Sequence, residues 1–130
     1  DVLAPCALDN VITEKNAESI KAKIIVEGAN GPTNTAADET LYKKGVIVVP
    51  DIVANGGGVI VSYFEWVQSI SSYFWDEDEV NTNMKKIIVD AFERTLKMAQ
   101  EKNINMRQAA MGVAVKHLER AMLLRGLYPR

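Results

Sequence analysis

Short apolar runs alternate with helix-like segments over residues 1–50 of the chain. Three runs have the length and the apolar composition of strands: residues 2–5, 24–26 and 46–49. Two segments between them carry helical signals: residues 13–20, with Thr13 as N-cap, and about 34–44, ending at Gly45. Strands that alternate with helices are joined by right-handed βαβ crossovers. The sequence therefore predicts a parallel sheet.

The second half of the chain is predicted to be helical. Its first apolar positions follow helical spacing: Val59, Tyr63, Trp66, Val67 and Ile70. Asp76 with Glu79 three residues later has the pattern of a capping box and predicts the start of a second helix. Asn105 with Gln108 opens a last helix, which we expect to end before Gly126.

Together these patterns predict an α/β fold: half of a Rossmann-like parallel sheet, with about three strands and crossover helices, followed by carboxyl-terminal helices. We expect residues 1–130 to form a single domain fragment, with a βαβ part at 1–58 and a helical part at 59–130. Because the chain opens on a strand without a preceding βαβ unit, we expect it to be the second half of a larger domain. A half-sheet exposes an edge strand, which predicts self-association.

Composition excludes several classes of function. A chain of 130 residues with 48% hydrophobic and 25% charged residues has the make-up of an ordinary globular domain. The net charge of −2 and the scattered lysines argue against a nucleic-acid partner. No segment reaches the roughly 18 apolar residues of a membrane span or resembles a signal peptide. We therefore expect a cytoplasmic protein without a membrane partner, with an organelle matrix as the alternative.

The chain has one cysteine and one histidine, which limits its chemistry. Cys6 has no disulfide partner and no activating residue nearby in sequence, so we expect a small, buried, structural thiol. His117 lies in a helical stripe that favours core or interface packing, and the two residues cannot build a metal cluster. We expect no metal site. For the aromatic-rich stretch at residues 63–75 we expect core packing, with a subunit or domain contact as the alternative.

Asn30 and Asn55 each lie in a glycine-containing turn downstream of a predicted strand. The carboxyl ends of parallel strands form the ligand crevice of an open α/β sheet, so we expect both amides to point into one site. Each amide offers a donor and an acceptor, which suits the carboxamide and ribose hydroxyls of a nicotinamide nucleoside. The alternative is that both asparagines only stabilise their own turns.

A glycine triplet at residues 56–58 follows Asn55 directly. Such a triplet lets the backbone approach a ligand closely and opens a helix whose free N–H groups favour an anion or a carbonyl. Two alternatives remain open. One is a plain turn or hinge, and the other is a dinucleotide fingerprint in which Val61 replaces the third glycine and Asp76 supplies the acidic residue.

Three motifs carry a family resemblance: residues 27–33 (EGANGPT), 50–59 (PDIVANGGGV) and 61–68 (VSYFEWVQ). They are similar to the carboxyl-terminal part of hexameric glutamate dehydrogenase, in the Glu/Leu/Phe/Val dehydrogenase family, and the similarity covers nearly the whole chain. The resemblance implies an NAD(P)-dependent oxidoreductase of amino acid metabolism. Its reaction would be the oxidative deamination of L-glutamate to 2-oxoglutarate and ammonia.

The resemblance also implies roles for individual residues. Asn30 and Asn55 match asparagines that lie along the nicotinamide ribose, and Gly56 and Gly57 belong to the same cofactor site. Three further residues match a segment on the nicotinamide face: Pro5, Cys6 and Ala7. Val59 and Ser62 match the pocket for the amino-acid side chain, where the hydroxyl binds the distal carboxylate of glutamate.

No catalytic residue is assigned within the chain. In the family the catalytic lysine and aspartate belong to an amino-terminal substrate domain, so we expect this chain to be inactive alone. The choice between NAD and NADP stays open, and the resemblance implies a homo-oligomer, a hexamer in the parent enzyme. Two alternatives are a non-catalytic α/β module that binds a nucleotide or another subunit, and an amino-acid dehydrogenase of other specificity.

Overall fold

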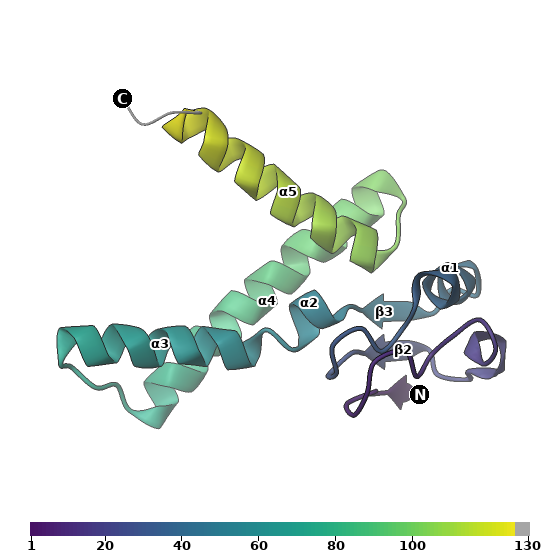
Figure 1. Cartoon of the computed structure of the whole chain (residues 1–130), viewed down its shortest axis with the longest axis horizontal. Coiled ribbons are helices and arrows are strands. Elements are labelled where there is room, and N and C mark those ends of the chain that lie inside the picture. Colours follow the sequence, from purple (N-terminus) through teal and green to yellow (C-terminus); the bar gives the residue numbers. More distant parts are fainter. Residues whose placement is uncertain (127–130) are drawn as a thin grey trace.

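The computed structural model describes residues 1–126, and its amino-terminal part is a parallel sheet (Figure 1). The sheet has three strands, β1 (Val2–Leu3), β2 (Ile24–Val26) and β3 (Ile47–Val49). Their order is β1-β2-β3, and both neighbouring pairs are parallel. The predicted parallel sheet of about three strands is therefore confirmed.

Helical segments lie between the later strands and make up most of the chain after β3, while loops form most of the connection from β1 to β2. The helical segments are η1 (Ala17–Ser19), α1 (Thr35–Lys43), α2 (Asp51–Ala54), α3 (Gly57–Ser71), α4 (Glu77–Lys102) and α5 (Met106–Arg125). The helices predicted to start near residues 34, 59, 76 and 105 are confirmed as α1, α3, α4 and α5. The helix predicted over residues 13–20 is wrong, because only the single 3-10 turn η1 forms there. The sequence analysis missed α2, one turn that separates β3 from α3.

Three asparagine and aspartate side chains fix where the longer helices begin. Asn34 Oδ1 accepts a hydrogen bond from the backbone N–H of Ala37 at 2.9 Å, which starts α1. The capping residues of α4 and α5, Asp76 and Asn105, accept in the same way from the third residue beyond them, at 2.7 and 2.8 Å. Thr13 does not cap η1. Its own N–H donates instead to the side chain of Asn16.

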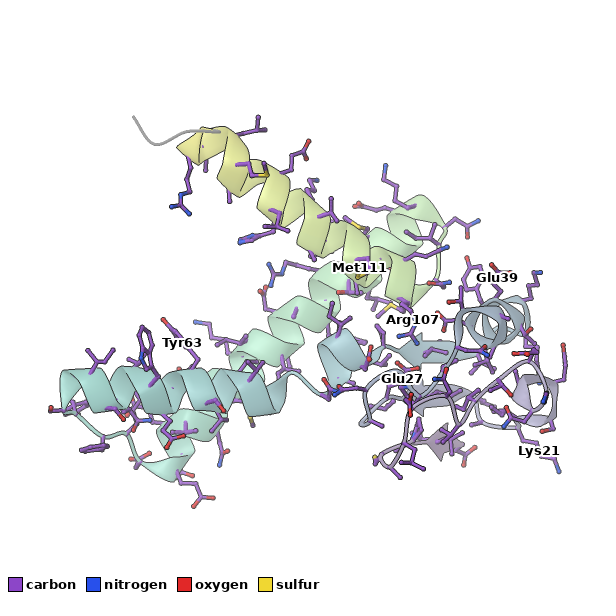
Figure 2. The ribbon with its side chains drawn as sticks, viewed as in Figure 1. Lys21, Glu27, Glu39, Tyr63, Arg107 and Met111 are labelled. Atoms are coloured by element: carbon purple, nitrogen blue, oxygen red, sulfur yellow. The ribbon has the colours of Figure 1, made fainter. Side chains whose placement is uncertain are left out.

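Most of the aromatic-rich stretch lies at the surface. Phe64 is buried and packs edge-on against Trp75, with ring centroids 5.2 Å apart. Four other aromatic side chains are between 58% and 75% exposed: Tyr63, Trp66, Tyr73 and Phe74. Figure 2 shows Tyr63 projecting outward from α3, where its ring centroid lies 5.8 Å from that of Trp66. The core-packing prediction is therefore wrong for these four side chains, and a contact with another subunit or domain stays a prediction.

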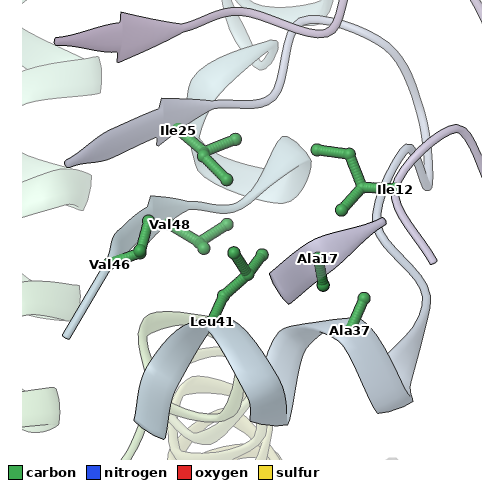
Figure 3. Close-up of a cluster of buried hydrophobic side chains, with 7 residues drawn as sticks. All are labelled: Ile12, Ala17, Ile25, Ala37, Leu41, Val46 and Val48. Carbon is green, nitrogen blue, oxygen red and sulfur yellow. The ribbon is translucent and has the colours of Figure 1, made fainter. Parts of the chain in front are cut away.

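Two buried clusters stabilise the two parts of the fold. The first joins η1, α1 and the strands β2 and β3 (Figure 3), and consists of Ile12, Ala17, Ile25, Ala37, Leu41, Val46 and Val48. The second lies where α4 meets α5 and centres on Ala99, Met106 and Ala109. Helix α4 also contacts α2 and α3. Thus α4 and α5 form a hairpin that packs beside the sheet, while α3 extends away from it (Figure 1).

His117 lies on the exposed part of α5, so the prediction that it packs in a core is wrong. Packing of His117 at an interface stays a prediction. Among the described residues, no helix is both long enough and apolar enough to cross a membrane.

Leu41→Ala tests the first cluster. Leu41 is completely buried between α1 and the sheet, so its truncation is expected to lower the free energy of unfolding by about 2–5 kcal/mol. Leu123→Ala is the matched control, because Leu123 is 79% exposed and its truncation should change stability by less than about 0.5 kcal/mol. Urea denaturation measures both. Equal effects would contradict this assignment of the core.

Candidate functional site

Asn30 and Asn55 meet at the carboxyl end of the sheet, as the sequence predicts. Asn55 Nδ2 donates to Asn30 Oδ1 at 2.7 Å and to the backbone oxygen of Gly28 at 3.3 Å. Within residues 1–126, the other half of each amide, Asn30 Nδ2 and Asn55 Oδ1, makes no hydrogen bond. The pair therefore presents one donor and one acceptor to a ligand.

The two asparagines border an open cleft of about 600 Å³. Its lining residues come from the segments after β1, β2 and α2: Ala7, Leu8, Asp9, Gly28, Ala29, Asn30 and Asn55. Asp9 is the one charged side chain among them, and the sequence analysis missed it. A carboxylate accepts hydrogen bonds and disfavours a neighbouring phosphate, so this cleft suits hydroxyl and amide donors.

The segment after β1 is tied to the turn after β2. The backbone oxygen of Pro5 accepts hydrogen bonds from the N–H groups of Gly28 and Ala29, at 3.0 and 2.9 Å. A Cβ atom on Gly28 would lie 2.6 Å from Cys6 Sγ, so a larger residue at this position would force the Cys6 side chain to move. Cys6 is exposed, and the prediction of a buried thiol is wrong. Of the predicted nicotinamide-face residues, Ala7 lines the cleft directly.

The glycine triplet does not line the cleft. A Cβ atom on Gly57 would contact Ile88 and Met84 of α4, each at 3.5 Å, so this glycine faces another helix. Gly56 has an ordinary helical φ of −62°. Because α2 separates the triplet from β3, the strand–turn–helix geometry of a dinucleotide fingerprint does not form here.

Val59 and Ser62 lie in the first turns of α3, and both are exposed. Neither lines the cleft beside Asn30 and Asn55. Their spacing of three residues places them on neighbouring positions of the helix surface. Their side chains are thus available for contacts with groups that do not belong to residues 1–126.

A buried ion cluster lies next to this cleft, and the sequence analysis missed it. Arg107, at the start of α5, contacts three carboxylates: Glu27 Oε1 at 2.6 Å, Asp38 Oδ2 at 2.8 Å and Asp51 Oδ1 at 3.2 Å. Figure 2 shows Arg107 and Glu27 close together. Glu27 is completely buried. The sequence does contain a signal for this cluster. Glu27 and Asp51 are acidic residues that follow the apolar runs of β2 and β3 within two residues. Charged residues at buried strand ends require a partner.

The same carboxylates bind the backbone of the cleft. Glu27 Oε2 accepts from the N–H of Asp51 at 2.9 Å, and Asp51 Oδ2 accepts from the N–H of Gly31 at 2.8 Å. Gly31 follows Asn30 directly and has a φ of +56°, which favours glycine. The ion cluster therefore connects α5 to the turn that carries Asn30.

Two members of the cluster, Asp38 and Arg107, have shifted pKa values. Burial raises the pKa of Asp38, and the hydrogen bond and charge of Arg107 oppose this shift without cancelling it. The negative charges of Glu27 and Asp51 add to the rise. Burial alone would lower the pKa of Arg107, but its hydrogen bonds to Glu27 and Asp38 raise it. Arg107 is therefore cationic at any physiological pH.

The described residues contain no group of three or more His, Cys, Asp or Glu side chains arranged to hold a metal ion. The carboxylates of the ion cluster are oriented toward Arg107 instead. The polar side chains of the cleft, Asp9, Asn30 and Asn55, offer hydrogen bonds to a ligand.

Comparison with known proteins supports the resemblance. Residues 1–126 match the family model of the Glutamate/Leucine/Phenylalanine/Valine dehydrogenases. The chain is 50% identical over 129 residues to glutamate dehydrogenase of Thermotoga maritima, covering 99% of this chain and 31% of that protein. It is 48% identical over 128 residues to NAD-specific glutamate dehydrogenase of Clostridioides difficile, covering 98% and 30%. The chain thus spans about a third of the length of these relatives.

A solved structure agrees with the fold. The crystal structure of hetero-hexameric glutamate dehydrogenase from Thermus thermophilus, in its leucine-bound form, superposes with a TM-score of 0.90 at 33% identity. The match covers 98% of this chain and 31% of that one. The strand order and the helical arrangement described above therefore recur in a longer protein.

Asp38→Asn tests the charge balance of the ion cluster. Because the pKa of Asp38 is raised in the folded state, its protonation stabilises the fold below its unfolded-state pKa, and this stabilisation is lost as pH rises through the raised value. The free energy of unfolding of the unaltered chain, minus that of the variant, should therefore fall with rising pH. Urea denaturation of both proteins at a series of pH values measures this difference in the free energy of unfolding.

Asp90→Asn is the control for this titration, because Asp90 forms an exposed ion pair with Arg94 on α4. A difference for Asp38→Asn that rises with pH would show that the attraction of Arg107 dominates the other charges, and would contradict the stated balance.

Proposed function

The chain belongs to the glutamate/leucine/phenylalanine/valine dehydrogenase family, and we propose that it forms the nicotinamide side of the cofactor site in an NAD(P)-dependent glutamate dehydrogenase. The observation that carries the proposal is the hydrogen-bonded pair of Asn30 and Asn55 at the carboxyl end of a parallel sheet. This is the position at which open α/β sheets bind ligands.

The nicotinamide ribose would bind along the asparagine pair. Asn30 Nδ2 donates to a ribose or carboxamide oxygen, and Asn55 Oδ1 accepts from a hydroxyl. Asp9 in the same cleft offers a further acceptor. Pro5, Cys6 and Ala7 form the wall on the nicotinamide face. The bound cofactor supplies hydride transfer, and the residues of this chain orient the ring for it.

Gly56 and Gly57 contribute through the backbone. They stand at the start of α3, where the first N–H groups of a helix have no partner within the helix. Those groups suit a carbonyl or carboxylate oxygen of the cofactor or the substrate. Both glycines are partly exposed, so their N–H groups would meet a ligand on the side of the turn that faces away from α4.

The substrate would be L-glutamate, with 2-oxoglutarate and ammonia as products. Ser62 binds the distal carboxylate through its hydroxyl, and Val59 contacts the aliphatic part of the side chain. A hydroxyl suits a carboxylate, whereas a purely apolar substrate would favour an apolar residue at this position. The exposure of both residues supports the proposal, because a substrate pocket there needs a wall from another part of the enzyme.

The remaining catalytic parts would lie in the longer protein. The relatives are about three times as long as the region they share with this chain. We assign the catalytic lysine and aspartate, and the site for the cofactor diphosphate, to that additional length. A hexamer of the whole enzyme is the proposed assembly, as the Thermus thermophilus relative is named a hetero-hexamer. This chain alone would then bind weakly and turn over no substrate.

A ¹H–¹⁵N amide spectrum of the chain, titrated with NADH and then NADPH, tests the cofactor site. Shifts should be confined to the cleft residues, chiefly Asn30, Asn55 and Gly28, and to the backbone amides of Gly56 and Gly57. Asn30→Ala and Asn55→Ala should each weaken binding by about 2- to 10-fold, as expected for one lost hydrogen bond. Asn81→Ala, an exposed position on α4, is the control. A folded chain whose spectrum never moves, or moves elsewhere, would contradict the proposal.

Ser62→Ala in a full-length dehydrogenase that carries this chain tests the substrate. Loss of a hydrogen bond to a charged carboxylate should raise KM for L-glutamate by about 10- to 100-fold. The KM for the nicotinamide cofactor should stay unchanged. Ser69→Ala, further along the exposed surface of α3, is the matched control. Unaltered glutamate kinetics in Ser62→Ala would refute the substrate assignment.

A further inference from the structure

We infer that Arg107 is a positioning residue for the nicotinamide site, because its contacts with Glu27 and Asp51 hold the turn of Asn30 against the turn of Asn55. The identity of the ligand, a nicotinamide cofactor, rests on the function proposed above. The positioning itself rests on contacts within this chain. Arg107 lies 80 residues after Glu27 in sequence, so the inference links the last helix to the strand ends.

Asp51 is the residue through which both asparagines are held. Its Oδ2 accepts from the N–H of Gly31, the neighbour of Asn30. Its backbone oxygen accepts from the N–H of Asn55 at 3.0 Å, which closes the single turn of α2. The position of Asp51 therefore sets the positions of Asn30 and Asn55 together.

Arg107 fixes the orientation of Asp51 by two routes. Directly, it donates to Asp51 Oδ1, which leaves Oδ2 directed at Gly31. Indirectly, it donates to Glu27 Oε1, and Glu27 Oε2 in turn accepts from the N–H of Asp51. Glu27 thus uses one oxygen for the guanidinium and the other for a backbone amide, whereas Asp51 Oδ1 accepts both from Arg107 and from the N–H of Ile52 at 2.8 Å. Without the guanidinium, Asp51 would keep its hydrogen bonds to backbone amides but lose its charge partner, and the completely buried Glu27 would lack its charge partner as well.

The third partner of Arg107 provides an internal control. Asp38 accepts from Arg107 Nε but lies on α1, and in the described structure its carboxylate has no hydrogen bond to Asp51 or to the turn of Asn30. A variant at Asp38 therefore disturbs the same ion cluster without breaking the route to the asparagines. A purely structural role of Arg107 would make both kinds of variant alike.

Lysine cannot replace this arginine. The guanidinium uses Nε and both terminal nitrogens for three carboxylates in different directions. A lysine ammonium is a single point charge, which keeps the positive charge but cannot reach all three partners in that geometry. Arg107→Lys should therefore keep α5 next to the sheet and weaken the hold on Glu27 and Asp51.

The experiment compares Arg107→Lys, Asp38→Asn and the surface variant Arg94→Lys in this chain. The readouts are amide hydrogen exchange at Gly31 and the side-chain NH₂ resonances of Asn30 and Asn55, recorded without cofactor. Arg107→Lys should speed exchange at Gly31 by about 10-fold or more, as expected when a local hydrogen bond opens, and should shift both NH₂ signals. Asp38→Asn and Arg94→Lys should leave these signals unchanged.

A second variant keeps the inference testable if Arg107→Lys fails to fold. Asp51→Ala removes the connecting carboxylate while Glu27 and Asp38 still bind Arg107, and it should produce the same changes at Gly31 and Asn30. If Gly31 and both NH₂ groups are unaltered in folded Arg107→Lys or Asp51→Ala, the positioning role is overturned. The positioning role is also overturned if Asp38→Asn changes the exchange at Gly31 and both NH₂ signals as much as Arg107→Lys does.

An NADH titration of the same variants separates this inference from the proposed function. Weaker NADH binding in Arg107→Lys, with normal binding in Asp38→Asn, supports both. If the unaltered chain shows no cofactor-dependent shift at the cleft, the proposed function fails, while exchange at Gly31 still decides the role of Arg107. If the unaltered chain binds NADH and Arg107→Lys binds equally well with an unchanged Gly31, only the positioning role fails.

Discussion

The contact of Arg107 with three carboxylates is the interaction on which the arrangement of this chain depends. Glu27 stands completely buried at the end of β2, where an unpaired charge would be strongly unfavourable. Its partner comes from the first turn of α5, so the chain must return to the sheet after α4. The long helix α4 and the turn at Asn103, with a φ of +51°, make that return. The helical part is thereby placed next to the strand ends by charge as well as by apolar packing.

Apolar burial and polar contacts divide their roles in this fold. The cluster around Ile25 and Leu41 joins α1 to the sheet, and the cluster around Ala109 joins α4 to α5. Both are non-directional and leave the strand-end turns free to vary. Backbone N–H groups that donate to oxygens of Pro5, Glu27 and Asp51 fix those turns instead. The cleft geometry is thus set by directional bonds that rest on an apolar base.

Local signals in the sequence predicted most of the helices and strands, but they could not predict which distant side chains form the ion cluster. Strand composition and capping residues such as Asn105 act within a few residues, so β2, α1, α4 and α5 were found. The meeting of Asn30 and Asn55 followed from the rule that parallel strands end at one edge. The partner of Glu27 lies 80 residues away, and no periodicity marks it. Exposure of the aromatic stretch was misjudged because composition cannot tell a core from a surface that another domain covers.

The charge of the cleft limits which part of a dinucleotide it can hold. Its lining contains one carboxylate, Asp9, two amides, and neither lysine nor arginine. An oxidised nicotinamide ring is cationic and its ribose is rich in hydroxyls, so both suit such a lining. A diphosphate does not, because a nearby carboxylate repels it and the glycine triplet forms no phosphate-binding turn. For the proposed cofactor, the diphosphate must therefore bind to a different and more positive surface, and the two binding surfaces must be brought together at the carboxyl edge of the sheet.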